Sequence, residues 1–317
     1  MAPQKPKFRG IIADDGGVGM METNMRKQYV LTTEYLSDKD ERVVTLLGDI
    51  GVYSFKKIKD KHPNQVHNLG ILEPASIGIA AGLARVGYIP FFHTIAPFVV
   101  ERPYEQLKVD FSYQKLCGNF VSVGASYDDG ALGTTHYSPA DVAVLKYLPN
   151  MQIVLPGTAE EVHNLICSEY DNGSPTYFRL STAVNPETMP VKFGKAYIVK
   201  KGKLATIVAV GPMLKMVLEA VRDFDVTVLY YTTIAPFDYE TLAMNCSSSK
   251  VLLCEPFYSG VLTTDVCQAL QGYVMMDFVG VPHQILDSYG TREENDLNAG
   301  ITVEMISKKL MQLVERA

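Results

Sequence analysis

The chain has 317 residues, of which 47% are hydrophobic and 20% charged, a composition typical of a soluble globular protein with two domains. Its formal net charge of −6 argues against a surface dedicated to nucleic acid or to anionic membranes, and no apolar run reaches the roughly 18 residues of a membrane span. The N-terminal stretch has no apolar run, so we expect a cytoplasmic protein without a secretory signal, and the five cysteines and six histidines lack the spacing of metal ligands.

Apolar runs of strand length alternate with helical patterns in the first half of the chain. Strands are predicted at residues 43–47, 120–123, 151–155 and 177–180, and a helix at residues 73–86. Thr158, followed by two glutamates, has the features of a further helix start.

A polar stretch with two prolines, residues 185–192, is typical of a linker between domains. Beyond it, strands are predicted at 205–210, 226–230 and 251–254, and an amphipathic helix at 301–314. Strands that alternate with helices imply parallel sheets covered by helices on both faces. We therefore predict an α/β fold with an N-terminal extension (1–24), a first domain (25–184) and a smaller second domain (193–317).

Glu73 is the most informative residue of the sequence. It begins the helix predicted at 73–86, and that helix carries no other charge before Arg85. A buried carboxylate without a partner costs several kcal/mol, so such a group changes its protonation or finds a partner. One interpretation is a glutamate that shares a proton with a ligand nitrogen. The alternative is a carboxylate bonded to the free N–H groups of the helix start.

Four other patterns occur in order along the chain. Asp49 ends the first predicted strand, residues 90–98 read Pro-Phe-Phe-His-Thr-Ile-Ala-Pro-Phe, residues 130–136 read Gly-Ala-Leu-Gly-Thr-Thr-His, and residues 148–151 read Leu-Pro-Asn-Met. Together with the Glu73 segment they resemble the C-terminal half of transketolase, encoded as a separate polypeptide in split transketolases. The resemblance runs from about residue 25 to the C-terminus.

The resemblance implies a pyrimidine-binding domain followed by a transketolase C-terminal domain, with thiamine diphosphate as the cofactor. A partner polypeptide, the N-terminal transketolase-like subunit, would hold the diphosphate and Mg²⁺ through a Gly-Asp-Gly…Asn motif. That motif is not found here, because Gly48-Asp49-Ile50 lacks the second glycine and residues 16–19 read better as a flexible turn. We therefore expect a chain that is inactive alone and assembles as an α2β2 heterotetramer.

The resemblance also gives individual residues a role on the cofactor side. Glu73 would bond the pyrimidine nitrogen, Phe98 would stack on the ring, and Ile95 stands where the family has a second aromatic residue. Asp49 is assigned to the cofactor as well. His136 would face the reacting atoms and donate a hydrogen bond or pass a proton. The alternatives are core packing for Phe98 and a turn histidine for His136.

The substrate side departs from the family pattern. Leu132 replaces an aspartate that bonds a sugar hydroxyl, Pro74 replaces a polar residue after the glutamate, and Thr182 replaces an arginine that helps hold a phosphate. His93 and Arg179 are candidates for substrate contact, with a core role as the alternative for His93. We predict from these changes that ordinary pentose phosphates are poor substrates, and that the substrate is a small molecule of an unusual kind.

Two further pairs of residues lie close to these patterns. Arg102 and Glu105 are interpreted as a structural or interface pair without a chemical role. Asp128 and Asp129 precede the 130–136 loop and are alternatives for replacing the missing aspartate.

Three functions remain open from the sequence. The first is a subunit that transfers a two-carbon ketol or related acyl anion unit between carbonyl compounds. The second is a beta-type subunit of a 2-oxo acid dehydrogenase, or an acyloin-forming subunit similar to deoxyxylulose phosphate synthase. The third is a non-catalytic regulatory subunit that keeps the fold.

Overall fold

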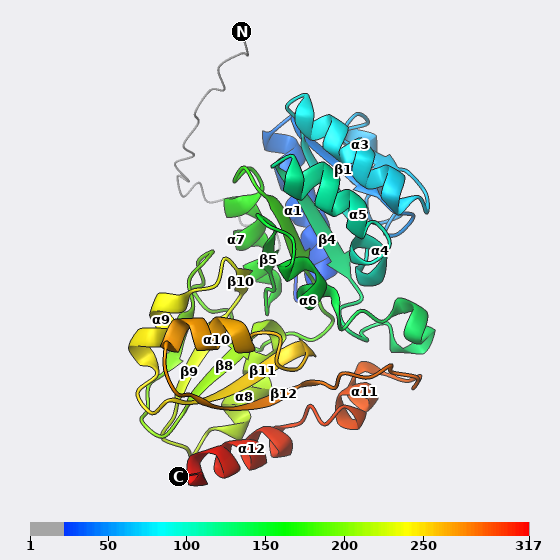
Figure 1. Ribbon diagram of the computed structural model, residues 1–317. Coiled ribbons are helices and arrows are strands. Elements are labelled where there is room, and N and C mark those ends of the chain that lie inside the picture. The colour runs from blue at the N-terminus through cyan, green and yellow to red at the C-terminus, as the bar shows by residue number, and fades with distance from the viewer. Residues whose placement is uncertain (1–21, 317) are drawn as a thin grey trace.

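A computed structural model describes residues 22–316 of the chain. Figure 1 shows two α/β units, with the N-terminal half in blue to green and the C-terminal half in yellow to red. Most of the predicted N-terminal extension, including residues 16–19, lies outside the described residues. Within residues 22–316, no helix has the length and apolar character needed to cross a membrane.

The first sheet has seven strands in the order β10-β5-β6-β4-β3-β1-β2, and only β10 runs antiparallel to its neighbour. Its strands are β1 (Val43–Leu47), β2 (Val66–Asn68), β3 (Ile89–Ile95), β4 (Gly118–Val123), β5 (Gln152–Val154), β6 (Pro175–Arg179) and β10 (Thr233–Ala235). The helices around it are α1 (Met25–Lys39), α2 (Lys56–Lys61), α3 (Glu73–Arg85), α4 (Ala96–Val100), α5 (Tyr104–Gln106), which continues as a π-helical turn (Leu107–Tyr113), α6 (Asp141–Lys146) and α7 (Ala159–Glu169).

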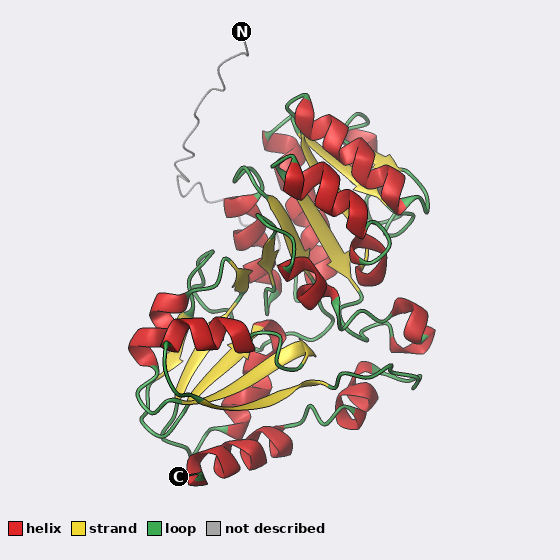
Figure 2. Ribbon diagram, in the orientation of Figure 1, coloured by secondary structure: helices red, strands yellow, loops and turns green. Residues whose placement is uncertain are grey.

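Helices cover both faces of this sheet, because successive side chains of a strand point to opposite sides. In β3, Phe92 packs in the apolar cluster that includes residues of α3, α4 and α6. Its neighbour Phe91 packs in the cluster that includes residues of α1 and α7. Figure 2 shows the strands between the two layers of helices.

The second sheet has five strands in the order β12-β11-β8-β9-β7, with β7 antiparallel to β9. Its strands are β7 (Tyr197–Lys200), β8 (Thr206–Val210), β9 (Thr227–Tyr231), β11 (Lys250–Tyr258) and β12 (Met275–Val281). The helices of this half are α8 (Leu214–Ala220), α9 (Tyr239–Asn245), α10 (Thr263–Leu270), α11 (Arg292–Asn298) and α12 (Val303–Glu315). The two mainly parallel sheets flanked by helices confirm the predicted fold class.

The chain does not divide into two sheets at the predicted linker. Strand β10 comes from the second half but pairs with β5 of the first sheet, through Thr233 and Val154. One apolar cluster also contains buried residues of both halves, among them Phe92 and Leu229. The two halves therefore share one sheet edge and part of one core.

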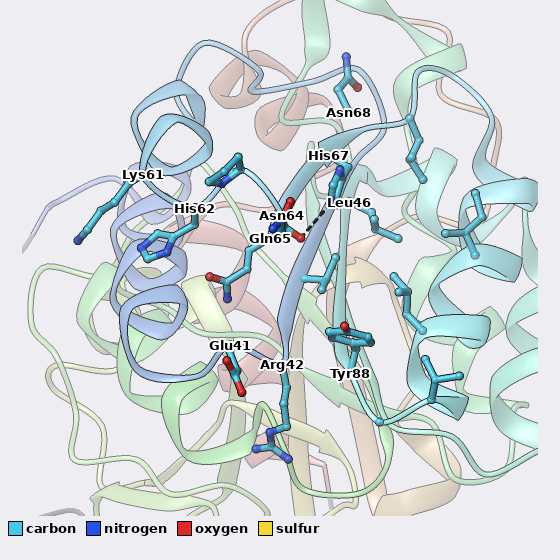
Figure 3. Close-up of a pocket in the computed structure, with 17 residues that line it drawn as sticks. Glu41, Arg42, Leu46, Lys61, His62, Asn64, Gln65, His67, Asn68 and Tyr88 are labelled. Atoms are coloured by element: carbon cyan, nitrogen blue, oxygen red, sulfur yellow. Dashed lines mark hydrogen bonds between the residues drawn. The ribbon is translucent and has the colours of Figure 1, made fainter.

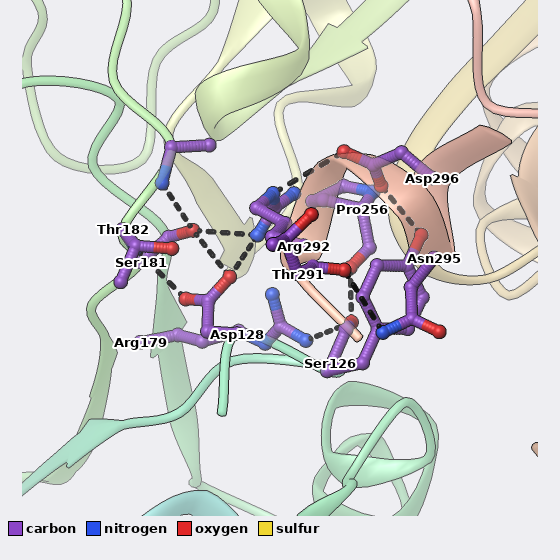
Figure 4. Close-up of polar contacts among 12 residues, drawn as sticks. Ser126, Asp128, Arg179, Ser181, Thr182, Pro256, Thr291, Arg292, Asn295 and Asp296 are labelled. Carbon is purple, nitrogen blue, oxygen red and sulfur yellow. Dashed lines mark hydrogen bonds and ion pairs between the residues drawn. The ribbon is translucent and has the colours of Figure 1, made fainter. Parts of the chain in front are cut away.

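A buried polar network, which we call the interdomain cluster, also joins the two halves. It consists of two neighbouring groups of bonded residues: Ser126, Asp141 and Arg179 form one, and Asp128, Ser181, Arg292 and Asp296 form the other. Figure 4 shows Arg292, from the start of α11, between Asp128 of the first half and Asp296. Arg292 and Asp128 expose only 9% and 0% of their side chains, so both charges are neutralised inside the protein.

Candidate active site

Glu73 lies at the first position of α3 and is almost fully buried, with 3% of the residue exposed. The helix can begin here because Pro74 occupies its first turn, where a missing N–H leaves no bond unmade. The residue before the helix, Leu72, makes no capping hydrogen bond with its side chain. The partner of the Glu73 carboxylate comes instead from a later part of the chain. Oε1 of Glu73 accepts a hydrogen bond of 2.7 Å from Nη1 of Arg102.

Arg102 connects Glu73 to Phe98. The centre of its guanidinium lies 3.8 Å from the centre of the Phe98 ring, a distance typical of a cation–π contact. The Arg102 side chain is 45% exposed, whereas that of Glu73 is 4% exposed. The interpretation of Arg102 and Glu105 as a pair is therefore corrected, because Arg102 bonds Glu73 across the fold.

His136 also contacts Phe98. The centres of their rings are 5.1 Å apart at an angle of 68°, an edge-to-face contact. His136 ends a helical turn, Thr134–His136, and its Nδ1 is 2.9 Å from the hydroxyl of Thr135. The turn follows Gly133, whose φ of +71° and close approach to the Tyr289 ring leave no room for a side chain. The structure thus brings Glu73, Phe98 and His136 together.

Ile95 and Asp129 both lie close to Gly124. A Cβ atom at Gly124 would lie 2.7 Å from Cγ2 of Ile95 and 2.6 Å from a carboxylate oxygen of Asp129. Burial, and then the charge of Asp128, raise the pKa of the Asp129 carboxyl group. The charge of His136 has the opposite effect on that pKa, which places His136 within electrostatic range of Asp129.

Asp49 is exposed after the end of β1 and adopts a left-handed backbone conformation with φ of +59°. Its Oδ1 accepts a hydrogen bond of 2.9 Å from the Asn68 side-chain amide, and its N–H donates one of 3.1 Å to the side-chain oxygen of Asn68. This pair fixes the loop after β1. The carboxyl ends of β1, β3 and β4 lie at one edge of a parallel sheet, where ligands of such folds bind.

Leu132 is 52% exposed and borders a cavity of about 510 Å³ between the 128–132 loop and the start of α11. The cavity also contains the acidic residues Asp129, Glu293 and Glu294. Arg292, which lines it as well, is engaged by Asp128 and Asp296. An anionic group entering this cavity would therefore meet mainly negative charge.

His93 lies in the core of the first domain. It is fully buried, packs against Tyr29 with ring centres 4.9 Å apart, and its Nδ1 is 2.8 Å from the Val121 carbonyl oxygen. Burial lowers the pKa of His93 to about 4, so the ring is neutral near pH 7. This is the core role that the sequence left as its alternative, and a substrate contact is not supported.

Arg179 is also buried, with 1% of its side chain exposed. Its Nε donates to Asp141 over 2.6 Å, and its Nη2 donates to the Ser126 hydroxyl over 2.7 Å. The guanidinium belongs to the interdomain cluster (Figure 4). We therefore replace the expected substrate contact of Arg179 by a structural role.

A groove of about 1050 Å³ lies elsewhere, along the outer edge of the first sheet between β2 and α3. Figure 3 shows it bordered by Arg42, Lys61, His62 and Tyr88. Its basic groups already have partners, since Arg42 bonds Asp40 and both Lys61 and His62 bond Asp38. None of Glu73, Phe98 and His136 lines this groove, so its size does not make it the reaction site.

The sequence pointed to Arg102 but paired it with Glu105, and it did not point to Arg26. Arg102 follows Phe98 by four positions, a spacing that places side chains on one side of a helical turn and could have indicated their contact. Arg26, exposed in the first turn of α1, lowers the pKa of Asp129 through its charge. Its nearness to Asp129 depends on how α1 packs, for which the sequence has no local signal.

Two family models together match most of the chain. Residues 21–186 match the pyrimidine-binding domain of transketolase, and residues 194–295 match the transketolase C-terminal domain. Both models were expected from the resemblance of the motifs.

Two relatives match this chain over almost their whole length. A 33.6 kDa protein of the fasciation locus of Rhodococcoides fascians is 34% identical over 91% of this chain and 94% of its own. A subunit of the apulose-4-phosphate transketolase of Phocaeicola vulgatus is 29% identical over 93% of this chain and 100% of its own.

A solved structure of a split-gene transketolase, described as an inactive beta4 tetramer, superposes with a TM-score of 0.83. It is 25% identical and covers 92% of this chain and 99% of that one. The chain therefore belongs to the transketolase family of thiamine diphosphate-dependent transferases and carries its pyrimidine-binding and C-terminal domains.

Proposed function

We propose that this chain contributes the pyrimidine half of the active site of a split transketolase-like enzyme, which transfers a two-carbon ketol or related acyl anion unit. The observation that supports it best is a buried carboxylate, Glu73, held at the edge of the site next to the Phe98 ring. Arg102, a flat cation, already bonds the carboxylate and stacks on the ring. A flat heterocycle with hydrogen-bonding nitrogens therefore fits the same two residues.

Each residue has a physical task in this proposal. When bound, thiamine diphosphate supplies a carbon nucleophile that attacks carbonyl groups. Glu73 holds a proton against the ring nitrogen, and Phe98 fixes the plane of the ring by stacking, an interaction of about 0.5–1.5 kcal/mol beyond burial. His136, which contacts Phe98 and bonds Thr135, would donate a hydrogen bond to an oxygen of the substrate.

The proposal requires a second polypeptide that binds the diphosphate and Mg²⁺. Two findings on relatives support this requirement. One relative is named as one subunit of a transketolase, and the superposed split-gene structure is described as an inactive tetramer of beta chains. We propose an α2β2 heterotetramer, with the cofactor between this chain and its partner.

The substrate side favours a compound other than an ordinary pentose phosphate. Leu132 offers no hydrogen bond, and the adjoining cavity is lined by Asp129, Glu293 and Glu294. A sugar hydroxyl left unpaired against Leu132 would cost about 1–3 kcal/mol. Arg26 is an exposed cation whose charge acts on Asp129 and offsets part of this negative charge.

Reconstitution with the diphosphate-binding partner tests the proposal. We expect thiamine diphosphate to bind the complex in the presence of Mg²⁺ and not the separate chain. The complex should turn over at least one member of a panel of ketose phosphates, unphosphorylated ketoses, apulose 4-phosphate and pyruvate. Robust turnover of xylulose 5-phosphate with ribose 5-phosphate would overturn the substrate proposal, and absence of cofactor binding would overturn the functional one.

One observation favours the regulatory alternative. The Glu73 carboxylate is already paired with Arg102, as expected for a site that has lost its ligand. The measurement of cofactor binding to the complex decides between the two functions, because a regulatory subunit would assemble with its partner and leave the cofactor unbound at Glu73.

A further inference from the structure

Arg102 makes, within the free chain, both contacts that the proposed function assigns to the pyrimidine ring. Its Nη1 donates to Oε1 of Glu73 over 2.7 Å, and its guanidinium lies 3.8 Å from the centre of the Phe98 ring. One planar group thus bonds the acid and covers the aromatic face at the same time.

The chemistry of the two groups is alike. A guanidinium is flat, delocalised and rich in N–H donors, and it stacks on aromatic rings. An aminopyrimidine is also flat and presents nitrogen atoms in its plane. The contact with Arg102 also stabilises the free chain, because burying the Glu73 carboxylate without any partner would cost free energy.

The position of Arg102 allows it to leave. Its side chain is 45% exposed, and it follows the end of α4, so rotation about its own bonds would bring the guanidinium into solvent. Water reaches the guanidinium, so its cation–π contact with Phe98 is weak. The buried Glu73 carboxylate needs a partner, and a ring nitrogen that takes the place of Arg102 would supply one.

We propose that Arg102 is an internal stand-in for the cofactor ring, which holds Glu73 and Phe98 in place until the ring displaces it. This inference rests on the proposed function and deepens it. The apparent affinity for a ligand falls by the fraction of molecules whose site is open. Arg102 should therefore weaken cofactor binding in the assembled complex while it stabilises the chain that lacks the cofactor.

The test measures the dissociation constant of thiamine diphosphate, with Mg²⁺, from the complex of this chain with its partner, by calorimetry. Arg102→Gln removes the competing cation, and we expect binding about 5- to 30-fold tighter, which corresponds to about 1–2 kcal/mol. Arg102→Lys keeps the charge but loses the planar stack, so we expect a smaller gain. Arg85→Gln is the matched control, because Arg85 is exposed at the end of α3 and bonds Gln114; its affinity should equal that of the wild type.

Thermal unfolding of the free chain provides a second readout of opposite sign. Arg102→Gln leaves Glu73 without its partner, so the free chain should unfold at a lower temperature although its complex binds the cofactor more tightly. A residue with only a structural role would lower both stability and affinity. If the wild-type complex binds and Arg102→Gln and Arg102→Lys bind no more tightly, the stand-in role is overturned and the proposed function is kept. If neither wild type nor variants bind, both are overturned.

Discussion

The interdomain cluster and the Glu73 site both contain a carboxylate paired with an arginine, but they differ in what surrounds the pair. Asp128 and Arg292 are enclosed, and Asp128 also accepts a hydrogen bond of 2.8 Å from the backbone N–H of Thr182. At the site, Glu73 is buried but Arg102 is about half exposed. The first pair is complete within the chain, whereas the second leaves one side open to another molecule.

This difference separates residues that hold the fold from residues that await a ligand. Arg179 and His93 were assigned to the substrate by sequence, yet their polar groups are enclosed by the chain itself. Glu73, Phe98 and His136 lie beside an arginine that solvent can reach. The exposure of the partner that a buried polar group bonds is thus a better guide to function here than nearness to a motif.

Breaking the interdomain cluster should have the largest effect on stability. Asp128→Asn leaves Arg292 with less compensation for its buried charge, and loss of one partner of a buried pair costs about 3–5 kcal/mol. We expect this loss in the free energy of unfolding, measured with urea. Asp60→Asn is the control, because the Lys56–Asp60 pair is exposed and worth less than about 1 kcal/mol. Equal effects of the two substitutions would contradict the comparison.

Glu255 of β11 is a third buried carboxylate, and it differs from Asp128 and Glu73 in having no arginine partner among the described residues. It accepts hydrogen bonds from the backbone N–H groups of Gly260 and Leu262. Burial raises the pKa of Glu255 to about 7, above its value of 4.5 in an unfolded chain. The folded state therefore binds the proton more tightly, and its contribution to stability is present below about pH 4.5 and is lost as pH rises through about 7. The full loss is about 3 kcal/mol.

Glu255→Gln should remove this component of the pH dependence. Urea unfolding between pH 5 and pH 8 would then show a flatter profile for the variant than for the wild type, whatever its overall stability. Parallel profiles would show that Glu255 is ionised throughout this range in the folded chain.

The smallest expected effect concerns the open side of the site. Phe98→Leu keeps apolar bulk but loses the aromatic face, and we expect thiamine diphosphate to bind the complex about 2- to 10-fold more weakly. This affinity is best measured in a chain that also carries Arg102→Gln, because Arg102 then no longer competes with the cofactor for the Phe98 ring. Tyr113→Leu, at an exposed aromatic residue, should leave the affinity unchanged; an unchanged affinity for Phe98→Leu as well would remove the ring from the cofactor site.

Much of the fold was predictable because its strands are fully buried runs between turn residues. The runs at 43–47 and 120–123 form β1 and most of β4, and the small-residue pattern after Glu73 forms α3. Strand β10 was not predictable, since nothing local shows that three residues of the second half pair with β5. Pairing across the chain depends on the assembled sheet and not on the residues alone.

The residues of the candidate site that lie in sequence motifs could be predicted. The bonds between residues far apart in the sequence could not. Glu73 and His136 were identified from their segments. The bond from Arg102 to Glu73 joins residues 29 positions apart, and the bond from Arg179 to Asp141 spans 38. Whether an arginine faces a ligand or a buried acid depends on such contacts, and the sequence patterns do not contain them.

The most direct test of the account is the Glu73→Gln variant in the reconstituted complex. Gln keeps the size of the side chain but cannot share a proton with the ring nitrogen, so turnover of the best substrate should fall by at least about 100-fold. The melting temperature and the assembly with the partner should stay close to those of the wild type. Unchanged turnover with bound thiamine diphosphate would contradict the assignment of Glu73, and with it the proposed active site.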